Sequence, residues 1–338
     1  MIDRRRRIEA FLAASGWRLD HMRPLADDAS FRSYHRLRDG ARRAVLMDAP
    51  PEHEDVRPFV RMARHLLGLG LSAPRILAED TEAGLLLLED LGDDTFTRLL
   101  EKGSDETTLY ALAVDVLIYL HRLPPLNALP AGLPAYDNER LLNEALLLTD
   151  WYLPAVLGAP SSETVRNAYI DAWSQTFLEI HAQPRTLVLR DFHVDNLIRL
   201  ADRHGVAACG LLDFQDAVAG AAAYDLMSLL EDARRDIAPD MKAAMLTRYF
   251  DGMEDLDRPG FETVFAILAA QRHAKVIGIF TRLCRRDGKA GYLVHIPRVW
   301  RLLERTLRHP ALAAVSAWFD TNVPREVRGI PACPPAAE

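Results

Sequence analysis

The spacing of apolar positions along the chain divides it into a β-rich part and a helical part. Short apolar runs bounded by Gly, Pro and Asp occupy residues 17–47 and 76–88, and they predict β-strands. Apolar side chains recur at helical spacing in residues 55–69, and residues 1–16 also indicate a helix. Beyond Gly92 helical patterns dominate, at residues 95–101, 107–122, 138–151, 162–183 and 260–283. We therefore expect an α+β chain with two lobes, a small β-rich N-terminal one and a larger, mostly helical C-terminal one.

A short β-like unit interrupts the helical part. Residues 186–189 form an apolar run, and the polar loop Asp191–Asn196 follows them. Two further β-like runs are joined by a turn, at residues 197–200, 201–205 and 206–212. Such a hairpin brings Asn196, at its start, and Asp213, at its end, to one edge.

Two carboxylates and a carboxamide at this spacing indicate phosphoryl transfer. In kinase-like sites one Asp accepts the proton of the attacking hydroxyl, an Asn five positions later binds Mg²⁺, and a further Asp binds Mg²⁺ as well. Here these would be Asp191, Asn196 and Asp213. A single Asp or Asn in a loop is usually a turn former, but the three together favour a phosphotransferase site, with Asp191 as catalytic base and the other two as metal ligands.

The same residues resemble the aminoglycoside phosphotransferase and choline kinase superfamily. Within it the chain is most similar to the bacterial kinases that act on the anomeric hydroxyl of N-acetylmuramate and N-acetylglucosamine. The segments that carry the resemblance are residues 28–34, 46–52, 86–92, 213–217 and 271–283. The resemblance spans about residues 26–301 and implies a protein-kinase-like fold, ATP and Mg²⁺ as cofactors, and a role in peptidoglycan recycling.

Two positions depart from the usual kinase pattern. Leu189 stands where the catalytic loop of the superfamily usually begins with His, and Met47 stands where a third-strand Lys usually contacts the phosphates. The loop at 28–34 is expected to cover the ATP phosphates, with Ser30, Phe31 and Arg32 as contacts. Arg32 or Arg43 could supply the missing positive charge.

The run Glu89-Asp90-Leu91-Gly92 reads as the linker between lobes 1–91 and 92–320. Adenine is expected to bind backbone groups here, which makes Glu89 and Leu91 candidate nucleotide contacts. The expected apolar walls are Leu46, Leu87 and Leu88.

Candidate sugar contacts come from the helical lobe and the catalytic loop. Sugar faces stack on aromatic rings, and a lactyl carboxylate attracts Arg or Lys. The candidates are Arg140, Glu144, Trp151, His193, Gln215, Arg272 and Lys275. The alternatives are core packing for Trp151 and a solvated helix face for Arg272 and Lys275. The resemblance also gives Asp225 a structural role in bracing the catalytic segment.

Composition narrows the class of protein. The 338 residues are 49% hydrophobic and 26% charged, with a net charge of −7, which argues against nucleic-acid binding. The three cysteines have no metal-ligand spacing and predict a reducing compartment without disulfides. We expect a cytoplasmic protein without membrane segment or obligate protein partner, a solvated basic cluster at Arg4–Arg7, and a flexible tail over residues 321–338.

Two other functions stay open from the sequence. One keeps the fold and changes the acceptor to choline, homoserine or an aminoglycoside. The other is a pseudokinase that binds nucleotide without turnover, which the departures at Met47 and Leu189 would suggest. Retention of Asp191, Asn196 and Asp213 argues against the pseudokinase.

Overall fold

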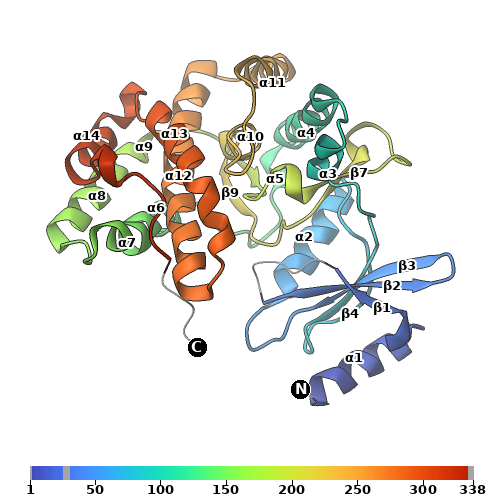
Figure 1. Cartoon of the computed structure of the whole chain (residues 1–338). Helices are drawn as coiled ribbons and strands as arrows, with labels where there is room; N and C mark the ends of the chain where they lie inside the picture. The colour runs from blue at the N-terminus through green and yellow to red at the C-terminus, as the bar shows by residue number, and fades with distance from the viewer. Residues whose placement is uncertain (1, 26–30, 334–338) are drawn as a thin grey trace. The chain divides into compact units, whose positions relative to one another are not determined.

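The chain forms two compact units (Figure 1). The computed structural model describes residues 2–25 and 31–333. The first unit lies within residues 1–116 and 194–217, and the second within 117–193 and 218–338. The first unit therefore extends past the predicted lobe boundary at residue 91 and takes in the hairpin that follows the catalytic loop.

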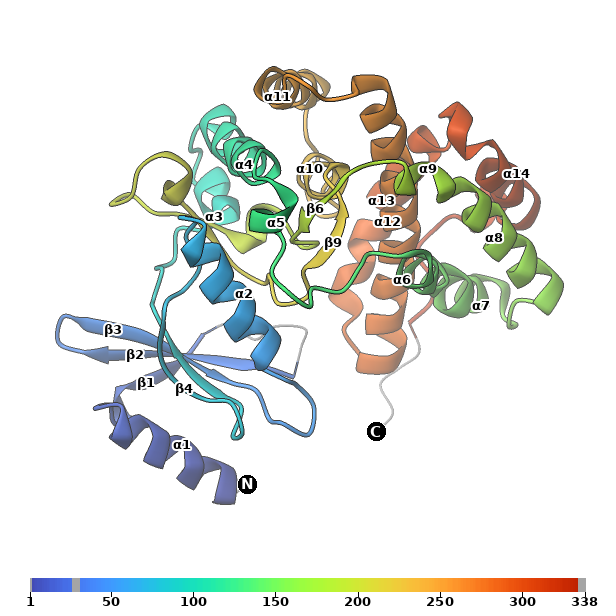
Figure 2. The same cartoon turned by 180° about the vertical axis from the view of Figure 1, so that it is seen from behind.

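A five-stranded antiparallel sheet organises the first unit, in the order β1-β2-β3-β5-β4. Its strands are β1 (Met22–Pro24), β2 (Ser33–Asp39), β3 (Arg42–Asp48), β4 (Ile76–Asp80) and β5 (Leu85–Leu88). The helices α1 (Ile2–Ala14) and α2 (Arg57–Gly68) lie on opposite sides of this sheet (Figures 1 and 2). The predicted β-rich N-terminal part is confirmed.

Strand alternation assigns the two faces of β3. Leu46 packs in a buried cluster with Leu85 and Leu87 of β5 and with Leu12 of α1. Since successive side chains point to opposite faces, Val45 and Met47 face the other way.

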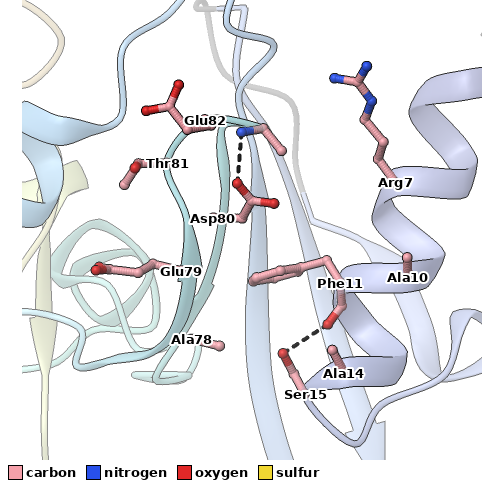
Figure 3. A pocket seen from close by; sticks show the side chains of 11 residues that line it. Arg7, Ala10, Phe11, Ala14, Ser15, Ala78, Glu79, Asp80, Thr81 and Glu82 are labelled. Atoms are coloured by element: carbon pink, nitrogen blue, oxygen red, sulfur yellow. Dashed lines mark hydrogen bonds between the residues drawn. The ribbon is translucent and has the colours of Figure 1, made fainter.

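Helix α1 is attached through one residue of its basic cluster. Arg4 Nε donates to Asp48 Oδ1 at 2.9 Å, and its guanidinium also donates to the carbonyl of Ala83. The expectation of a wholly solvated cluster is therefore wrong for Arg4. Figure 3 shows the open groove that α1 forms with the β4–β5 hairpin. The rim carboxylates Glu79 and Glu82 already pair with arginines of α2.

The remainder of the first unit carries the predicted hairpin. Its elements are α3 (Phe96–Glu101), most of α4 (Glu106–His121), and, after the catalytic loop, the 3₁₀ turn η3 (Val194–Asn196), β7 (Leu197–Arg199), η4 (Gly205–Ala208) and β8 (Cys209–Leu211). Strands β7 and β8 pair antiparallel with Leu197 opposite Leu211. The hairpin is confirmed, but η4 replaces the first half of its predicted second strand.

The second unit is mostly helical. Up to the candidate catalytic loop it contains α5 (Pro125–Ala128), α6 (Asn138–Ala145), the π-helical turn η2 (Leu148–Tyr152), α7 (Leu153–Leu157), α8 (Glu163–Thr176), α9 (Leu178–His181) and β6 (Arg185–Val188). After residue 217 follow β9 (Val218–Ala221), α10 (Ala223–Leu230), α11 (Pro239–Gly252), α12 (Arg258–Asp287), η5 (Ala290–His295), α13 (Ile296–Thr306), η6 (Pro310–Leu312), α14 (Ala313–Asn322) and η7 (Arg325–Val327). A separate turn, η1 (Leu19–His21), precedes β1 in the first unit.

Helix α12 is the core of the second unit and contacts α6, η2, α10 and α13 (Figure 2). Gly278 permits the close approach to η2, because a Cβ there would lie 2.3 Å from the backbone of Leu147. Among the described residues α12 alone is long and apolar enough to cross a membrane. Since 83% of its most apolar window is buried within the structure, it has the pattern of a core helix.

The C-terminal segment packs onto the second unit as far as the structure describes it. Arg328 donates to Glu304 Oε1 at 2.9 Å, and the Tyr152 hydroxyl donates to the carbonyl of Val327 at 2.7 Å. Cys284 of α12 forms a disulfide with Cys333. The expected flexible tail is therefore corrected for residues 321–333, and the expectation of no disulfide is wrong. Both errors arise because these contacts join positions far apart in the sequence.

Candidate active site

Two backbone positions distinguish the candidate catalytic segments. Arg190 has φ 70° and Asp213 has φ 55°, and no other non-glycine residue in the described part of the chain has a positive φ. Each such position costs about 1–3 kcal/mol and persists only where surrounding contacts impose it. Strain therefore concentrates directly before Asp191 and at the candidate metal ligand Asp213.

The first unit contains a cavity of about 360 Å³ at the linker. Its apolar lining includes Leu25, Tyr34, Val45, Phe59, Pro74, Leu88, Leu91, Ile198 and Leu212. Its polar lining includes Arg36, Glu89, Asp90, Asp93, Thr95, Arg98, Asp195, Asn196 and Asp213. Apolar walls with a few convergent polar groups are typical of a nucleotide or small-molecule site.

Of three predicted nucleotide contacts, Glu89 and Leu91 line this cavity and Leu46 does not. Leu91 lines it, and so does Glu89, whose carboxylate however pairs with Arg75 at 3.1 Å and with Arg203 at 2.6 Å. The prediction for Leu46 is corrected: Leu46 lies in the cluster under α1, and Val45 lines the cavity instead. A shift of one position along a strand moves a side chain to the opposite face.

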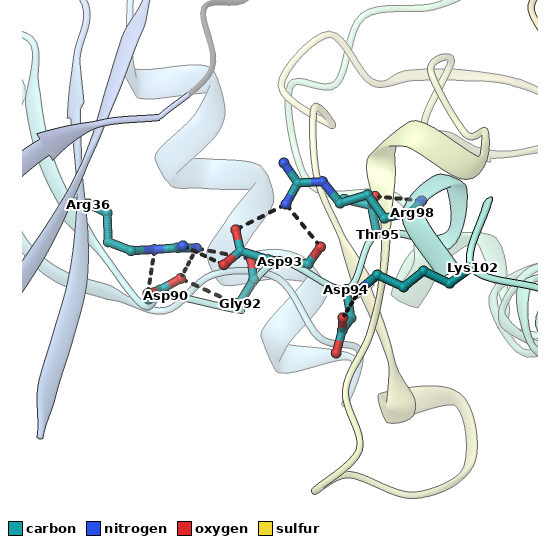
Figure 4. Close-up of polar contacts among 8 residues, drawn as sticks. All are labelled: Arg36, Asp90, Gly92, Asp93, Asp94, Thr95, Arg98 and Lys102. Carbon is teal, nitrogen blue, oxygen red and sulfur yellow. Dashed lines mark hydrogen bonds and ion pairs between the residues drawn. The ribbon is translucent and has the colours of Figure 1, made fainter. Parts of the chain in front are cut away.

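An ion-pair network that the sequence analysis missed fixes the linker (Figure 4). Arg36 of β2 donates to Asp90 at 2.9 Å and to Asp93 at 2.6 Å, and Arg98 also pairs with Asp93. The hydrogen bond from Arg36 holds the pKa of Asp93 below its usual value. Arg36 is more than fifty positions away from the linker, so no local pattern could have revealed this contact.

The hairpin brings the two candidate metal ligands to one end, as predicted. The backbone N–H of Leu212 donates to the carbonyl of Asn196 at 2.9 Å, directly before Asp213. Among the described residues no cluster of three or more His, Cys, Asp and Glu could hold a metal by itself. An Asn–Asp pair suits Mg²⁺, which commonly takes one or two protein oxygens together with phosphate oxygens and water.

The side chains around Asp213 include two further candidates. Arg32 Nη2 lies 3.5 Å from Asp213 Oδ1, and Gln215 Nε2 donates to the same oxygen at 2.8 Å. Gln215, a candidate sugar contact, therefore lies beside the candidate metal ligand Asp213 in the first unit. Phe31 is 67% exposed and stacks on His53, and Ser30 lies outside the described residues.

In the second unit, Asp191 is half-buried, and several basic side chains act on its charge. Burial alone would raise the pKa of its carboxyl, but the charges of Lys275, Arg272, His193 and Arg190 lower it below the usual value. Asp191 is thus an ionised carboxylate at neutral pH, as a catalytic base requires.

Asp225 of α10 braces the backbone before Asp191. Its carboxylate accepts hydrogen bonds from the N–H of Leu189 at 2.6 Å and of Arg190 at 2.9 Å. The second of these bonds lies at the residue with positive φ, so Asp225 helps to hold the strained backbone at Arg190. The structural role expected for Asp225 is confirmed by this geometry.

Glu144 of α6 is the centre of a buried polar cluster. It accepts from Lys275 at 3.0 Å and from Gln271 at 3.2 Å, and it also accepts from Arg190 and Tyr136. Burial would raise the pKa of Glu144, but Lys275 and Arg190 lower it. The sequence analysis identified Glu144 and Lys275 but missed the other three, which have no distinguishing local pattern.

The remaining candidate sugar contacts differ in burial. Arg272 and Lys275 are 6% and 9% exposed, so the alternative of a solvated helix face is wrong for both. His193 is buried, and burial lowers its pKa. Arg140 is exposed on α6, and Trp151 is half-buried in η2. The structure records no contact of either side chain with the Glu144 cluster among the described residues.

Substitution of Asp225 is expected to change the pH dependence of stability. Burial raises the pKa of Asp225 to about 7 from an ordinary 3.8. A raised folded-state pKa favours folding fully below pH 3.8 and loses that contribution as the pH rises to about 7, by roughly 4 kcal/mol. Urea unfolding of wild type between pH 4 and 8 should show this loss, and Asp225→Asn should lack it. Parallel curves for the two proteins would contradict the assignment.

The comparisons with known proteins agree with this fold and with phosphotransferase activity. The sequence model of the phosphotransferase enzyme family matches residues 21–260, so the chain belongs to that family. It is 37% identical to an N-acetylmuramate/N-acetylglucosamine kinase of Caulobacter vibrioides, over 94% of this chain and 96% of the relative. It is 41% identical to the kinase of the same name from Pseudomonas aeruginosa, over 86% and 85%. A choline/ethanolamine kinase family protein from Mesorhizobium loti shares the fold, with a TM-score of 0.62, 14% identity and coverage of 93% and 99%.

Proposed function

We propose that this protein is an ATP-dependent sugar kinase that phosphorylates the anomeric C1 hydroxyl of N-acetylmuramate and N-acetylglucosamine. The relatives at 37% and 41% identity carry both sugars in their names. The product would enter peptidoglycan recycling in the cytoplasm. No nucleic acid and no obligate protein partner is needed for this function.

One structural observation carries the chemistry of the proposal. The strained hairpin end presents Asn196 and Asp213 together at the lining of the linker cavity. Mg²⁺ bound there would neutralise phosphate charge, which is the main requirement of phosphoryl transfer. The apolar walls of the cavity suit adenine, and the linker backbone beside Leu91 can bind its edge.

The role of Asp191 is to accept the proton of the sugar hydroxyl. The buried cations Lys275 and Arg272 keep it ionised, and Asp225 fixes the backbone that carries it. Glu144 balances the charges of Arg190 and Lys275 and so holds both in place. Arg272 and Lys275 also have the charge that a lactyl carboxylate requires.

The second candidate acceptor, an aminoglycoside, fits this setting less well. A polycationic substrate needs a strongly acidic pocket, whereas the groups that act on Asp191 are Lys275, Arg272, His193 and Arg190. These groups include three cations against the one carboxylate, Glu144, that pairs with Lys275 and Arg190, which disfavours such a substrate and favours an anionic sugar.

Phosphorus NMR of the purified protein with Mg·ATP and N-acetylmuramate tests the proposal. The expected result is a sugar 1-phosphate signal together with ADP, and the same with N-acetylglucosamine. Choline, homoserine and an aminoglycoside serve as parallel acceptors. ADP formation with one of these and not with either amino sugar would overturn the substrate assignment.

A further inference from the structure

The position expected to carry a phosphate-binding lysine has no charge in this chain. Met47 lies in β3 and is fully buried, on the face of the strand that also carries Val45 of the linker cavity. Kinases place a cation there to hold the phosphates, and an acidic residue pairs with that cation and orients it. The thioether of Met47 has no charge, so it can neither hold the phosphates nor pair with an acidic residue.

Arg32 has the surroundings that this task requires. It directly precedes β2, and its side chain is only 9% exposed. Its Nη2 lies 3.5 Å from Asp213 Oδ1, and its Nε lies 3.7 Å from Glu54 Oε2. A buried guanidinium between a candidate metal ligand and a second carboxylate lies where nucleotide phosphates and Mg²⁺ would meet.

Glu54 is held in place by the turn before α2. Its backbone N–H donates to the carbonyl of Pro50 at 3.0 Å, and Pro50 follows β3 by two residues. The carboxylate is 24% exposed, and the structure gives it no partner besides Arg32 among the described contacts. Glu54 can therefore orient the Nε side of the guanidinium.

The other arginine suggested by the sequence does not meet these conditions. Arg43 is exposed and lies opposite Arg38 near the β2–β3 turn, at the other end of β3 from Met47. It is a matched control, since it is an arginine in the same sheet and has no contact with Asp213 in the structure.

We propose that Arg32, oriented by Glu54, is the phosphate-binding cation of this enzyme. It takes the role of the third-strand lysine, whose position is occupied by Met47 in this chain. This inference rests on the proposed ATP-dependent activity. The planar guanidinium has five donors, so it can pair with Glu54 through Nε and also donate to phosphate oxygens when nucleotide binds. The Arg32–Glu54 pair thus comes from the start of β2 and the turn before α2, whereas the corresponding Lys–Glu pair of protein kinases comes from the third strand and a helix.

Equilibrium binding of ATP and of adenosine separates this role from a merely structural one. For wild type, the dissociation constant of adenosine divided by that of ATP measures how much the phosphates contribute to binding. Arg32→Met is expected to reduce this ratio by about 10–100-fold, the size of the loss of one hydrogen bond to a charged group. Adenosine affinity should stay at the wild-type value, and Arg43→Met should change neither constant.

Two further variants sharpen the test. Arg32→Lys should retain part of the phosphate contribution because it keeps the charge, and Glu54→Gln should lower it by about tenfold because the guanidinium loses its orienting partner. Arg32→Met that binds ATP as tightly as wild type, with unchanged adenosine affinity, would overturn the proposal. Since binding is measured without acceptor, this result is independent of whether the sugar assignment holds.

Discussion

Asp191→Asn is expected to lower kcat for the amino sugars by about 10²–10⁴-fold, the usual contribution of a general base. The amide cannot accept the proton of the attacking hydroxyl. It also removes a negative charge on which Lys275 and Arg272 act. Steady-state kinetics with Mg·ATP and N-acetylmuramate measures the effect, and KM for ATP should change little because the loss concerns the transferring proton.

Two controls make this result specific. ATP affinity and the thermal unfolding midpoint of Asp191→Asn should stay close to wild type if the variant is folded. A folded variant that keeps more than half of the wild-type kcat would remove Asp191 from the role of base. The neighbouring carboxylate that braces the backbone, Asp225, would then be the next to test.

Asp213→Ala is expected to lower kcat by about 10²–10³-fold and to raise the Mg²⁺ concentration needed for half-maximal rate. The carboxylate is the charged member of the candidate metal pair, and Asn196 alone supplies one neutral oxygen. Loss of Asp213 also removes a carboxylate from beside Arg32. Rate measured against Mg²⁺ concentration at fixed ATP gives both quantities.

Asp202→Asn is a suitable control for this experiment, because Asp202 is exposed in the turn of the same hairpin. It should show wild-type rate and Mg²⁺ dependence. An unchanged Mg²⁺ requirement in Asp213→Ala would contradict the assignment of Asp213 as a ligand, even if its kcat were low.

Some features of the site followed from local sequence because local physics determines them. The hairpin that ends at Asp213 is a pattern of short apolar runs and a turn, and its pairing of Leu197 with Leu211 brings Asn196 and Asp213 to the same end. The β-rich start and the helical remainder likewise follow from the period of apolar positions. The fold class and the placement of Asn196 and Asp213 at one end of the hairpin could therefore be predicted.

Other features depend on the pairing of distant segments. The alternation of side chains along β3 does not determine which face of the strand packs on α1. The sequence therefore predicts Leu46 as a wall of the cavity, whereas Val45 lines it. In the network at the linker Arg36 lies 54 residues from Asp90, and in the Glu144 cluster Arg190 lies 46 residues from Glu144. Burial of Arg272 and Lys275 follows from the packing of α12, which hydropathy alone does not reveal for charged residues.

The sequence by itself determined which chemistry this protein can perform, because Asp191, Asn196 and Asp213 lie in short segments whose residue types and spacing define the phosphotransfer pattern. Only the tertiary structure decided which charges act on these residues. Arg32 lies beside Asp213, and Lys275 and Arg272 act on Asp191, because sheet and helix packing bring together side chains about 80–180 positions apart. Electrostatic interaction depends on distance in space and on burial, and neither is written in the local order of residues.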